Sequence, residues 1–254
     1  MRLLVLFFCL LGNVSYSISN ADTLDKFSAY ISIGEIAYRD SYIIPGGLPG
    51  YAYGFGLERS NLTRSKNYEL SLNMDFKHAS LYNKQSPDFK NPYILYAFKS
   101  KCRYAKNIYS ISNSFKIKCG VECCFNGFYA NSNRKYLESN GNWNLSFNSF
   151  FGLSYDKSRW RIEGRCSIPI AIVGYFPPYQ EVGNDKNSKL TYFLKVNTVT
   201  SVRRYFEIDR SVSIAYKLKK RRIGLCYSST YLRYDIHETE CLLTLNNLGF
   251  FYTF

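Results

Sequence analysis

The sequence lacks the long apolar runs of a helical membrane protein. Outside its first dozen positions, no apolar stretch approaches the roughly 18 residues that a transmembrane helix requires. Histidine is scarce, with 2 residues in the chain, and no phosphate-binding loop, dinucleotide fingerprint, zinc-protease helix or paired CxxC motif is present. These absences exclude a helical membrane protein, and they leave no motif from which to expect a metal or another cofactor.

Tyrosine and phenylalanine, in contrast, are abundant, with 24 and 19 residues. Both residue types favour the pleated, half-buried surface of a β-strand. At 254 residues, the chain is long enough for one large all-β domain or two small ones, and no linker or internal repeat divides it. The composition therefore predicts an all-β protein.

The N-terminal stretch MRLLVLFFCLLGNVSYSISNAD has the layout of a secretory signal peptide. One arginine precedes an apolar run from Leu3 to Leu11, and small and polar residues follow. We expect a signal peptide over 1–19, with cleavage within 15–21, and a mature domain over 20–254.

Alternation of apolar and polar residues recurs along the mature chain. In YELSLNMDFKH, for example, Tyr68, Leu70 and Phe76 share one face of a strand, while Glu69 and Asp75 share the other. The same period predicts ten strands near 27–39, 51–63, 68–79, 93–104, 108–125, 141–155, 159–173, 204–217, 222–235 and 241–254.

Short and long connections alternate between these strands. The tight connections are 64–67, 105–107, 156–158 and 218–221, and longer ones lie between them. Bacterial outer-membrane barrels have short periplasmic turns and longer external loops. A two-sheet sandwich, the alternative all-β fold, has no reason to sort its connections by end. The layout therefore predicts a single closed antiparallel transmembrane β-barrel.

The segment LTYFLKVNTV at 190–199 also has a strand-like pattern. Counting it as one spanning strand would give eleven and leave the C-terminus outside. We therefore expect it to belong to a long external loop that extends the rim or folds back over it. A barrel of twelve strands is the alternative.

The chain ends on a strand pattern, with Leu248, Phe250, Tyr252 and Phe254 at alternate positions. In a closed barrel the last strand pairs with the first, which leaves no open edge. Alternate apolar residues ending in phenylalanine resemble the C-terminal signal read by the bacterial outer-membrane insertion machinery. This resemblance implies a location in the cell outer membrane and the barrel-assembly machinery as a partner during insertion.

The mature chain as a whole, including GYFPPY at 174–179, resembles uncharacterised outer-membrane β-barrel proteins of gut-type anaerobic bacteria, the Bacteroidetes type. The resemblance implies a fold and assigns a role to no residue.

Seven cysteines remain after the predicted cleavage, and an odd count leaves at least one free thiol. The predicted hairpins place Cys102 opposite Ser110, Cys166 opposite Asn148 or Ser149, and Cys226 opposite Ser213. No cysteine then faces another across its own hairpin. We expect free thiols that pack as small apolar residues.

The two histidines are the candidates for catalysis. In YLRYDIHETE, Asp235 and His237 are two residues apart and therefore on one strand face, at the external end of the ninth strand. Outer-membrane proteases of the omptin type use an Asp–His pair with further acidic residues on the rim, and Asp235/His237 resembles that pair. However, Asp75 and His78 fall on different strand faces, so no acidic doublet stands opposite. A solvated rim pair is the simpler interpretation.

The polar strand faces carry charges of both signs, which can pair inside a narrow barrel. We expect the lumen to be largely filled by these side chains: Glu58, Glu69, Asp75, Lys77, Lys99, Lys116, Lys118, Glu122, Arg161, Glu163, Arg165, Glu207, Asp209 and Lys217.

The formal net charge of +14 is concentrated in the tight connections. The densest cluster consists of Lys217, Lys219, Lys220, Arg221 and Arg222. Such a run is typical of nucleic-acid binding, but a secreted barrel meets little nucleic acid. We expect the cluster to contact anionic lipid headgroups of the inner leaflet of the outer membrane.

These observations favour a non-enzymatic outer-membrane barrel with a structural or surface-binding role, whose external ligand the sequence does not identify. The first alternative is a barrel enzyme, an omptin-like protease or a lipid-modifying enzyme, that acts through Asp235/His237 at the rim. The second alternative is a small specific channel.

Overall fold

The structure is a computed structural model that describes residues 23–40, 44–63, 68–82, 93–111, 114–131, 140–175, 197–200, 204–219, 221–236 and 239–254. The predicted signal peptide at 1–19 and its cleavage region lie outside these ranges. In the described part of the chain, no helix is long and apolar enough to cross a membrane.

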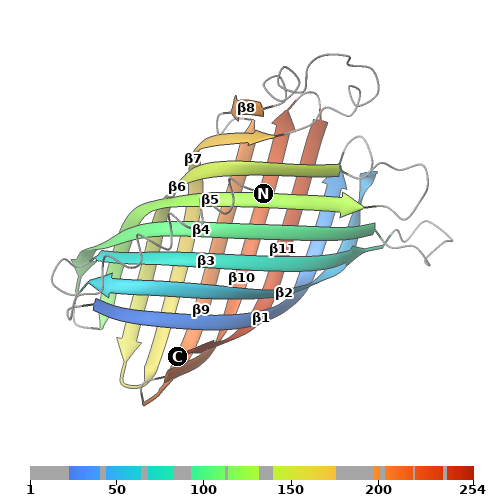
Figure 1. The fold of residues 1–254 in the computed structure, drawn as a ribbon. Helices are drawn as coiled ribbons and strands as arrows, with labels where there is room; N and C mark the ends of the chain where they lie inside the picture. The colour runs from blue at the N-terminus through green and yellow to red at the C-terminus, as the bar shows by residue number, and fades with distance from the viewer. Residues whose placement is uncertain are drawn as a thin grey trace.

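The alternating sequence pattern forms eleven strands: β1 (Thr23–Asp40), β2 (Ile44–Thr63), β3 (Tyr68–Leu81), β4 (Tyr93–Ser110), β5 (Phe115–Asn131), β6 (Asn140–Lys157), β7 (Trp160–Tyr175), β8 (Asn197–Thr200), β9 (Tyr205–Leu218), β10 (Arg221–Ile236) and β11 (Thr239–Thr253). Ten of them, all except the short β8, close into one antiparallel barrel in the order β6-β5-β4-β3-β2-β1-β11-β10-β9-β7, with β7 paired to β6 (Figure 1). The predicted barrel is confirmed, and a sandwich is excluded because the described strands form one sheet.

The β8 strand extends the rim and does not span the barrel. It pairs with the end of β7, from Ile172 opposite Thr200 to Tyr175 opposite Asn197. The twelve-strand alternative is therefore wrong. The remainder of the segment 190–199, residues 190–196, lies outside the described residues.

The first and last strands close the barrel, as the C-terminal pattern predicts. β1 pairs with β11 from Ser28 opposite Thr253 to Asp40 opposite Cys241. The backbone N–H of Phe254 adds a hydrogen bond to the carbonyl oxygen of Phe27 at 2.8 Å. The chain end is thus held in the sheet.

The predicted turn at 105–107 is wrong. β4 continues to Ser110 and β5 begins at Phe115, with an irregularity in the ladder between Asn107 and Tyr109. The physical reason is that the small polar residues Ser112, Asn113 and Ser114 favour a reversal, whereas the charges before 105 belong to the strand alternation. As a result, Cys102 lies opposite Cys123 and not opposite Ser110.

The hairpin between β6 and β7 is tighter than predicted. Lys157 pairs with Trp160, and Ser158 takes a φ of 56°, the left-handed conformation that two-residue hairpin turns use. The register therefore shifts, and Cys166 lies opposite Phe151, not Asn148 or Ser149. The predicted pairing of Cys226 with Ser213 is confirmed.

The barrel has two rims, the turn end and the loop end. The turn end carries the four short connections, after Thr63, Ser110, Lys157 and Leu218, together with the start of β1 and the end of β11. The loop end is the opposite rim. Near the turn end, outward-facing side chains are large and apolar, such as Ile31, Phe55, Val121, Val212 and Phe250.

An apolar outer surface of this extent on a closed barrel is a lipid-facing surface. Aromatic pairs lie near the turn end of this surface. Their ring centroids are 5.6 Å apart for Tyr68 and Tyr104 and 5.0 Å apart for Trp160 and Tyr216. These features are those of a transmembrane β-barrel.

Candidate functional site

The inner and outer faces of the barrel exchange character along its axis. On the turn-end part of β1, the outward-facing Ile31 is 66% exposed. Further toward the loop end, Glu35 and Arg39 face outward, while Ile36 and Tyr38 are buried in the lumen. The loop-end part of β1 therefore follows the rule of a water-soluble protein, with polar residues outside and apolar residues inside.

β10 repeats this exchange at the loop end. Leu232 and Tyr234 are buried inside, and Arg233 and Asp235 are exposed outside. On these two strands, the loop-end part of the outer face is thus suited to water, and the turn-end part is suited to lipid.

Apolar side chains fill the loop-end part of the lumen, and we call them the plug. Tyr38 and Phe128 pack edge to face at 6.1 Å, and Tyr205 stacks on Tyr234 at 6.4 Å between ring centroids. The plug consists of Ile36, Tyr38, Leu48, Ala52, Ala79, Leu81, Leu95, Phe128, Ile172, Tyr205, Leu232, Tyr234, Cys241, Leu243 and Leu245. The expectation of a lumen filled by charged side chains is therefore incomplete.

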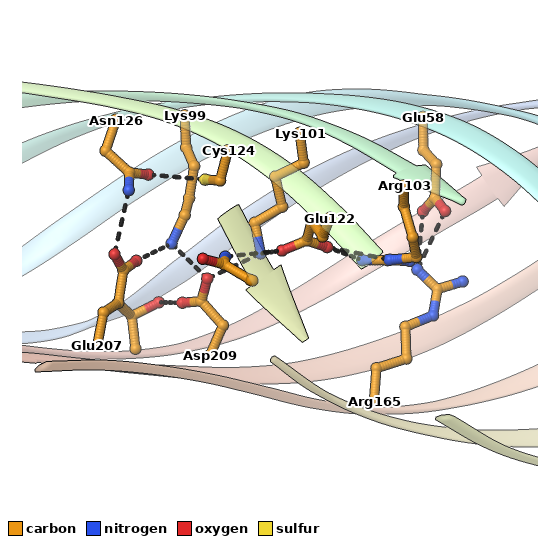
Figure 2. A network of polar contacts seen from close by, with 12 residues as sticks. Glu58, Lys99, Lys101, Arg103, Glu122, Cys124, Asn126, Arg165, Glu207 and Asp209 are labelled. Carbon is orange, nitrogen blue, oxygen red and sulfur yellow. Dashed lines mark hydrogen bonds and ion pairs between the residues drawn. The ribbon is translucent and has the colours of Figure 1, made fainter. Parts of the chain in front are cut away.

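On the turn-end side of the plug, a charged network crosses the lumen (Figure 2). Lys99 Nζ lies 2.5 Å from both Glu207 Oε1 and Asp209 Oδ2, and Lys101 Nζ lies 2.8 Å from Asp209 Oδ2. Tyr205 donates a hydrogen bond to Glu207 Oε2 at 2.8 Å, which joins the network to the plug. β4 and β9 are thereby connected across the barrel.

Glu122 continues the network on β5. Arg103 donates to Glu122 Oε2 from Nε at 3.0 Å and from Nη2 at 2.8 Å, and Lys101 Nζ lies 3.4 Å from Oε1. The Arg103 guanidinium also stacks over the ring of Phe150, at 4.2 Å from its centroid. Lys101 and Arg103, which the sequence pattern places near a turn, therefore belong to the interior.

A second network lies nearer the turn end. Glu163 accepts hydrogen bonds from Arg161 Nη2 at 3.1 Å and from Arg165 Nε at 3.0 Å, and Arg165 Nη1 also donates to Glu58 Oε1 at 3.0 Å. Lys118 Nζ donates to Glu69 at 2.6 Å. These contacts have the ordered geometry that buried charges require.

A cavity of about 260 Å³ remains between the two networks and the turn end. Its lining runs from Lys99 and Asp209, below the plug, to Lys26, Lys116 and Arg222 at the turn-end mouth. Polar side chains dominate this lining, so the cavity is suited to water and to polar or charged solutes.

The predicted Asp235/His237 pair gains no support from the geometry. Asp235 is exposed on the outer face of β10, in register with Glu240, and His237 lies outside the described residues. Asp75 faces the lumen beside Lys77 at 3.1 Å, while His78 packs on Tyr96 outside, at 5.2 Å between ring centroids. Asp75 and His78 lie on different faces, as the alternation predicts.

The basic cluster at the β9–β10 connection divides between two environments. Lys219 is exposed in the turn with a φ of 52°, Arg221 is exposed, and Arg222 lines the lumen. Lys217 alternates with the buried Ala215 and so faces the lumen side at the rim. Lys220 lies outside the described residues. Contact of this cluster with lipid headgroups stays a prediction.

Seven free cysteines occur among the described residues: Cys102, Cys119, Cys123, Cys124, Cys166, Cys226 and Cys241. The expectation that no cysteine faces another across its own hairpin is wrong for one pair. Cys102 and Cys123 face each other across β4 and β5 on the lipid side. In the described ranges, no group of three or more His, Cys, Asp or Glu side chains is arranged to hold a metal ion.

The chain matches no protein-family model and no curated protein sequence. Similar solved structures include the outer-membrane protease OmpT of Escherichia coli, with a TM-score of 0.45 and 10% identity over 90% of this chain and 97% of that one. Neisserial surface protein A gives 0.34 and 10% over 89% and 95%. The Pseudomonas putida toluene transporter TodX gives 0.33 and 8% over 94% and 91%.

These neighbours are outer-membrane β-barrel proteins of Gram-negative bacteria. They are too distant to transfer a role to any residue of this chain. The narrower resemblance to barrels of the Bacteroidetes type has no family model behind it.

Proposed function

We propose that this protein is a non-enzymatic outer-membrane barrel with a structural or surface-binding role, and that its lumen does not conduct solutes. The plug is the observation that carries the proposal. Tyr38 and Tyr205, its largest fully buried side chains, are 1% and 0% exposed. Among the described residues, the lining of the cavity reaches Lys99 and Asp209 and includes no residue of the plug.

The loop end supports a binding role. On β1 and β10 its outer face is polar, with Glu35, Arg39 and Arg233 exposed. A rim that projects into water presents its connections to partners outside the cell. The plug stiffens the strands from which those connections arise, as a scaffold for binding loops requires.

Planar bilayer recordings test the closed lumen. The refolded barrel is expected to give no discrete conductance steps. The double variant Tyr38→Ala/Phe128→Ala, which removes the edge-to-face pair, is expected to give small steps. A matched variant, Tyr53→Ala, removes an outward-facing ring of the same kind and should stay silent. Conductance steps from the unmodified protein would support the channel alternative and overturn the proposal.

Peptide hydrolysis tests the enzyme alternative. The purified barrel is incubated with fluorogenic peptides and with phospholipid vesicles, and product release is measured. We expect no turnover above a heat-inactivated sample. Turnover that is lost in His237→Ala and kept in the control His78→Ala would establish a barrel enzyme and contradict the proposed function.

A further inference from the structure

The turn-end mouth of the cavity carries an excess of positive charge. Five cations and three carboxylates line it, and we call them the mouth cluster: Lys26, Lys116, Lys118, Arg161 and Arg222, with Glu69, Asp156 and Glu163. They come from six strands that converge on one opening. The excess amounts to two positive charges.

Ion pairs inside the cluster use every carboxylate. Lys118 binds Glu69 at 2.6 Å, and Arg161 lies 3.1 Å from Glu163 and 3.8 Å from Asp156. Within the described part of the chain, Lys26, Lys116 and Arg222 have no ion pair and no side-chain hydrogen bond. Three cations therefore face the cavity with their hydrogen-bond donors available.

These cations repel one another. The charges of Arg161 and Arg222 repel Lys26, which Glu69 attracts. The charge of Arg161 repels Arg222, which Asp156 and Glu163 attract. Lys26 and Arg222 are only partly exposed, so solvent screens this repulsion less than it would on an open surface. An anion between them would convert the repulsion into attraction.

An uncharged donor lies beside the cations. Ser154 lines the cavity, is 2% exposed, and its Oγ has no hydrogen-bond partner among the described residues. The register places Ser154 between Lys116 on β5 and Glu163 on β7. A buried hydroxyl without a partner is costly unless something else accepts its hydrogen bond.

We propose that the mouth cluster binds a phosphate-type dianion, either inorganic phosphate or a phosphate monoester, from the aqueous space at the turn end. Such a group carries a charge of about −1.5 to −2 at neutral pH, which matches the excess of two positive charges. Its three or more oxygens suit a guanidinium fork, two ammonium groups and a hydroxyl. A phosphodiester headgroup carries one charge and matches less well. This inference is independent of what the loop end binds.

Calorimetric titration of the refolded barrel in a maltoside detergent, which contains no phosphate, tests the inference with inorganic phosphate as the probe. Saturable binding is expected. Arg222→Gln and Lys26→Gln should each raise the dissociation constant by about tenfold or more, because each removes a charge-assisted hydrogen bond. Ser154→Ala, which keeps the charge unchanged, should raise it by a smaller factor.

Lys219→Gln is the matched control, since it removes the same charge from the turn beside the mouth and outside the cavity. It should leave the dissociation constant unchanged. Anomalous gel migration before and after boiling confirms that each variant is folded. Equal weakening by Lys219→Gln and Arg222→Gln would reveal only a general charge effect and would overturn the site.

Two further titrations identify the ligand class. Citrate, a carboxylate polyanion, should bind more weakly than phosphate, and equal affinity would overturn the assignment to phosphate. Phosphatidylglycerol in mixed maltoside micelles should not compete with phosphate. Competition that is lost in Arg222→Gln would assign the site to a lipid headgroup and overturn an aqueous ligand.

Discussion

Lys99 Nζ on β4 lies 2.5 Å from Glu207 Oε1 on β9, on the far wall of the barrel. The same ammonium lies 2.5 Å from Asp209 Oδ2. Because β4 and β9 share no backbone hydrogen bonds, this contact resists flattening of the barrel in a way that the sheet ladder cannot. The charged interior is therefore a cross-brace of the fold.

Replacement of Lys99 by methionine should destabilise the barrel strongly. Among the described residues, the change leaves Glu207 without an ion pair and Asp209 with Lys101 alone. Breaking a buried pair in this way costs about 3–5 kcal/mol. Urea unfolding of the refolded protein in lipid vesicles measures the loss. Lys116→Met, which removes a lysine without an ion pair, should cost far less. The triple variant Lys99→Met/Glu207→Gln/Asp209→Asn should recover much of the stability, and no recovery would contradict the explanation.

Substitution by alanine is expected to have opposite effects on stability at Gly120 and at Gly164. A Cβ on Gly120 would overlap the carbonyl oxygen of Tyr104 on the paired strand, whereas a Cβ on Gly164 would meet nothing within 4 Å. Gly120→Ala must therefore move backbone and should cost about 1–3 kcal/mol or more. Gly164→Ala should be neutral or stabilise by up to about 1 kcal/mol. Equal unfolding midpoints for the two variants would show that β4 and β5 are not so closely paired.

The barrel was predictable from the sequence because one physical rule governs the membrane part of each strand: apolar side chains face lipid and polar side chains face the lumen. On β1 this part includes Phe27 to Ile31. The C-terminal alternation likewise predicted the lipid-facing positions of Leu248 and Phe250, which are 54% and 48% exposed. Period alone sufficed wherever a strand crosses the bilayer.

The plug was not predicted, although the sequence contains its signal. In EIAYR, the apolar residues Ile36 and Tyr38 sit on the phase that polar residues occupy earlier in the same strand. A change of phase without a break in the strand means that the surroundings outside change from lipid to water. The assumption of a single phase for each strand therefore conceals the plug.

Turn positions and contacts across the barrel could not be predicted from the sequence, for a different reason. Lys101 and Arg103 lie near the end of the predicted strand 93–104, and the sequence pattern did not assign them to the lumen. Their contacts with Asp209 and Glu122 depend on which strands face each other across the lumen, and that depends on closure and register together. The mouth residue Lys26 was missed because the predicted first strand begins at 27, whereas β1 begins at Thr23.

Thiol labelling tests the division of the lumen. Cys226 lines the cavity, and Cys241 is 0% exposed within the plug. In single-cysteine variants, a small anionic thiol reagent should modify Cys226 in the folded barrel and Cys241 only after unfolding. Mass spectrometry measures the modified fraction. A lipid-side control with only Cys102 should react with a lipid-soluble maleimide and not with the anionic reagent. Modification of Cys241 in the folded state would contradict a sealed loop end.

Phe254 allows the structural and the targeting roles of the C-terminus to be separated. Its N–H binds Phe27, and its ring lies 5.9 Å from the Phe27 ring and 4.7 Å from the Tyr252 ring, measured between centroids. Deleting Phe254 should cost about 1–3 kcal/mol of stability in vesicles, from one hydrogen bond and two aromatic contacts. In cells it should abolish most outer-membrane assembly if the insertion machinery reads this residue. Phe250→Ala removes a similar ring from the same lipid-facing row and should lower stability without this loss of assembly. An equal effect of both variants on assembly would mean that the machinery responds to barrel stability and not to a terminal aromatic residue.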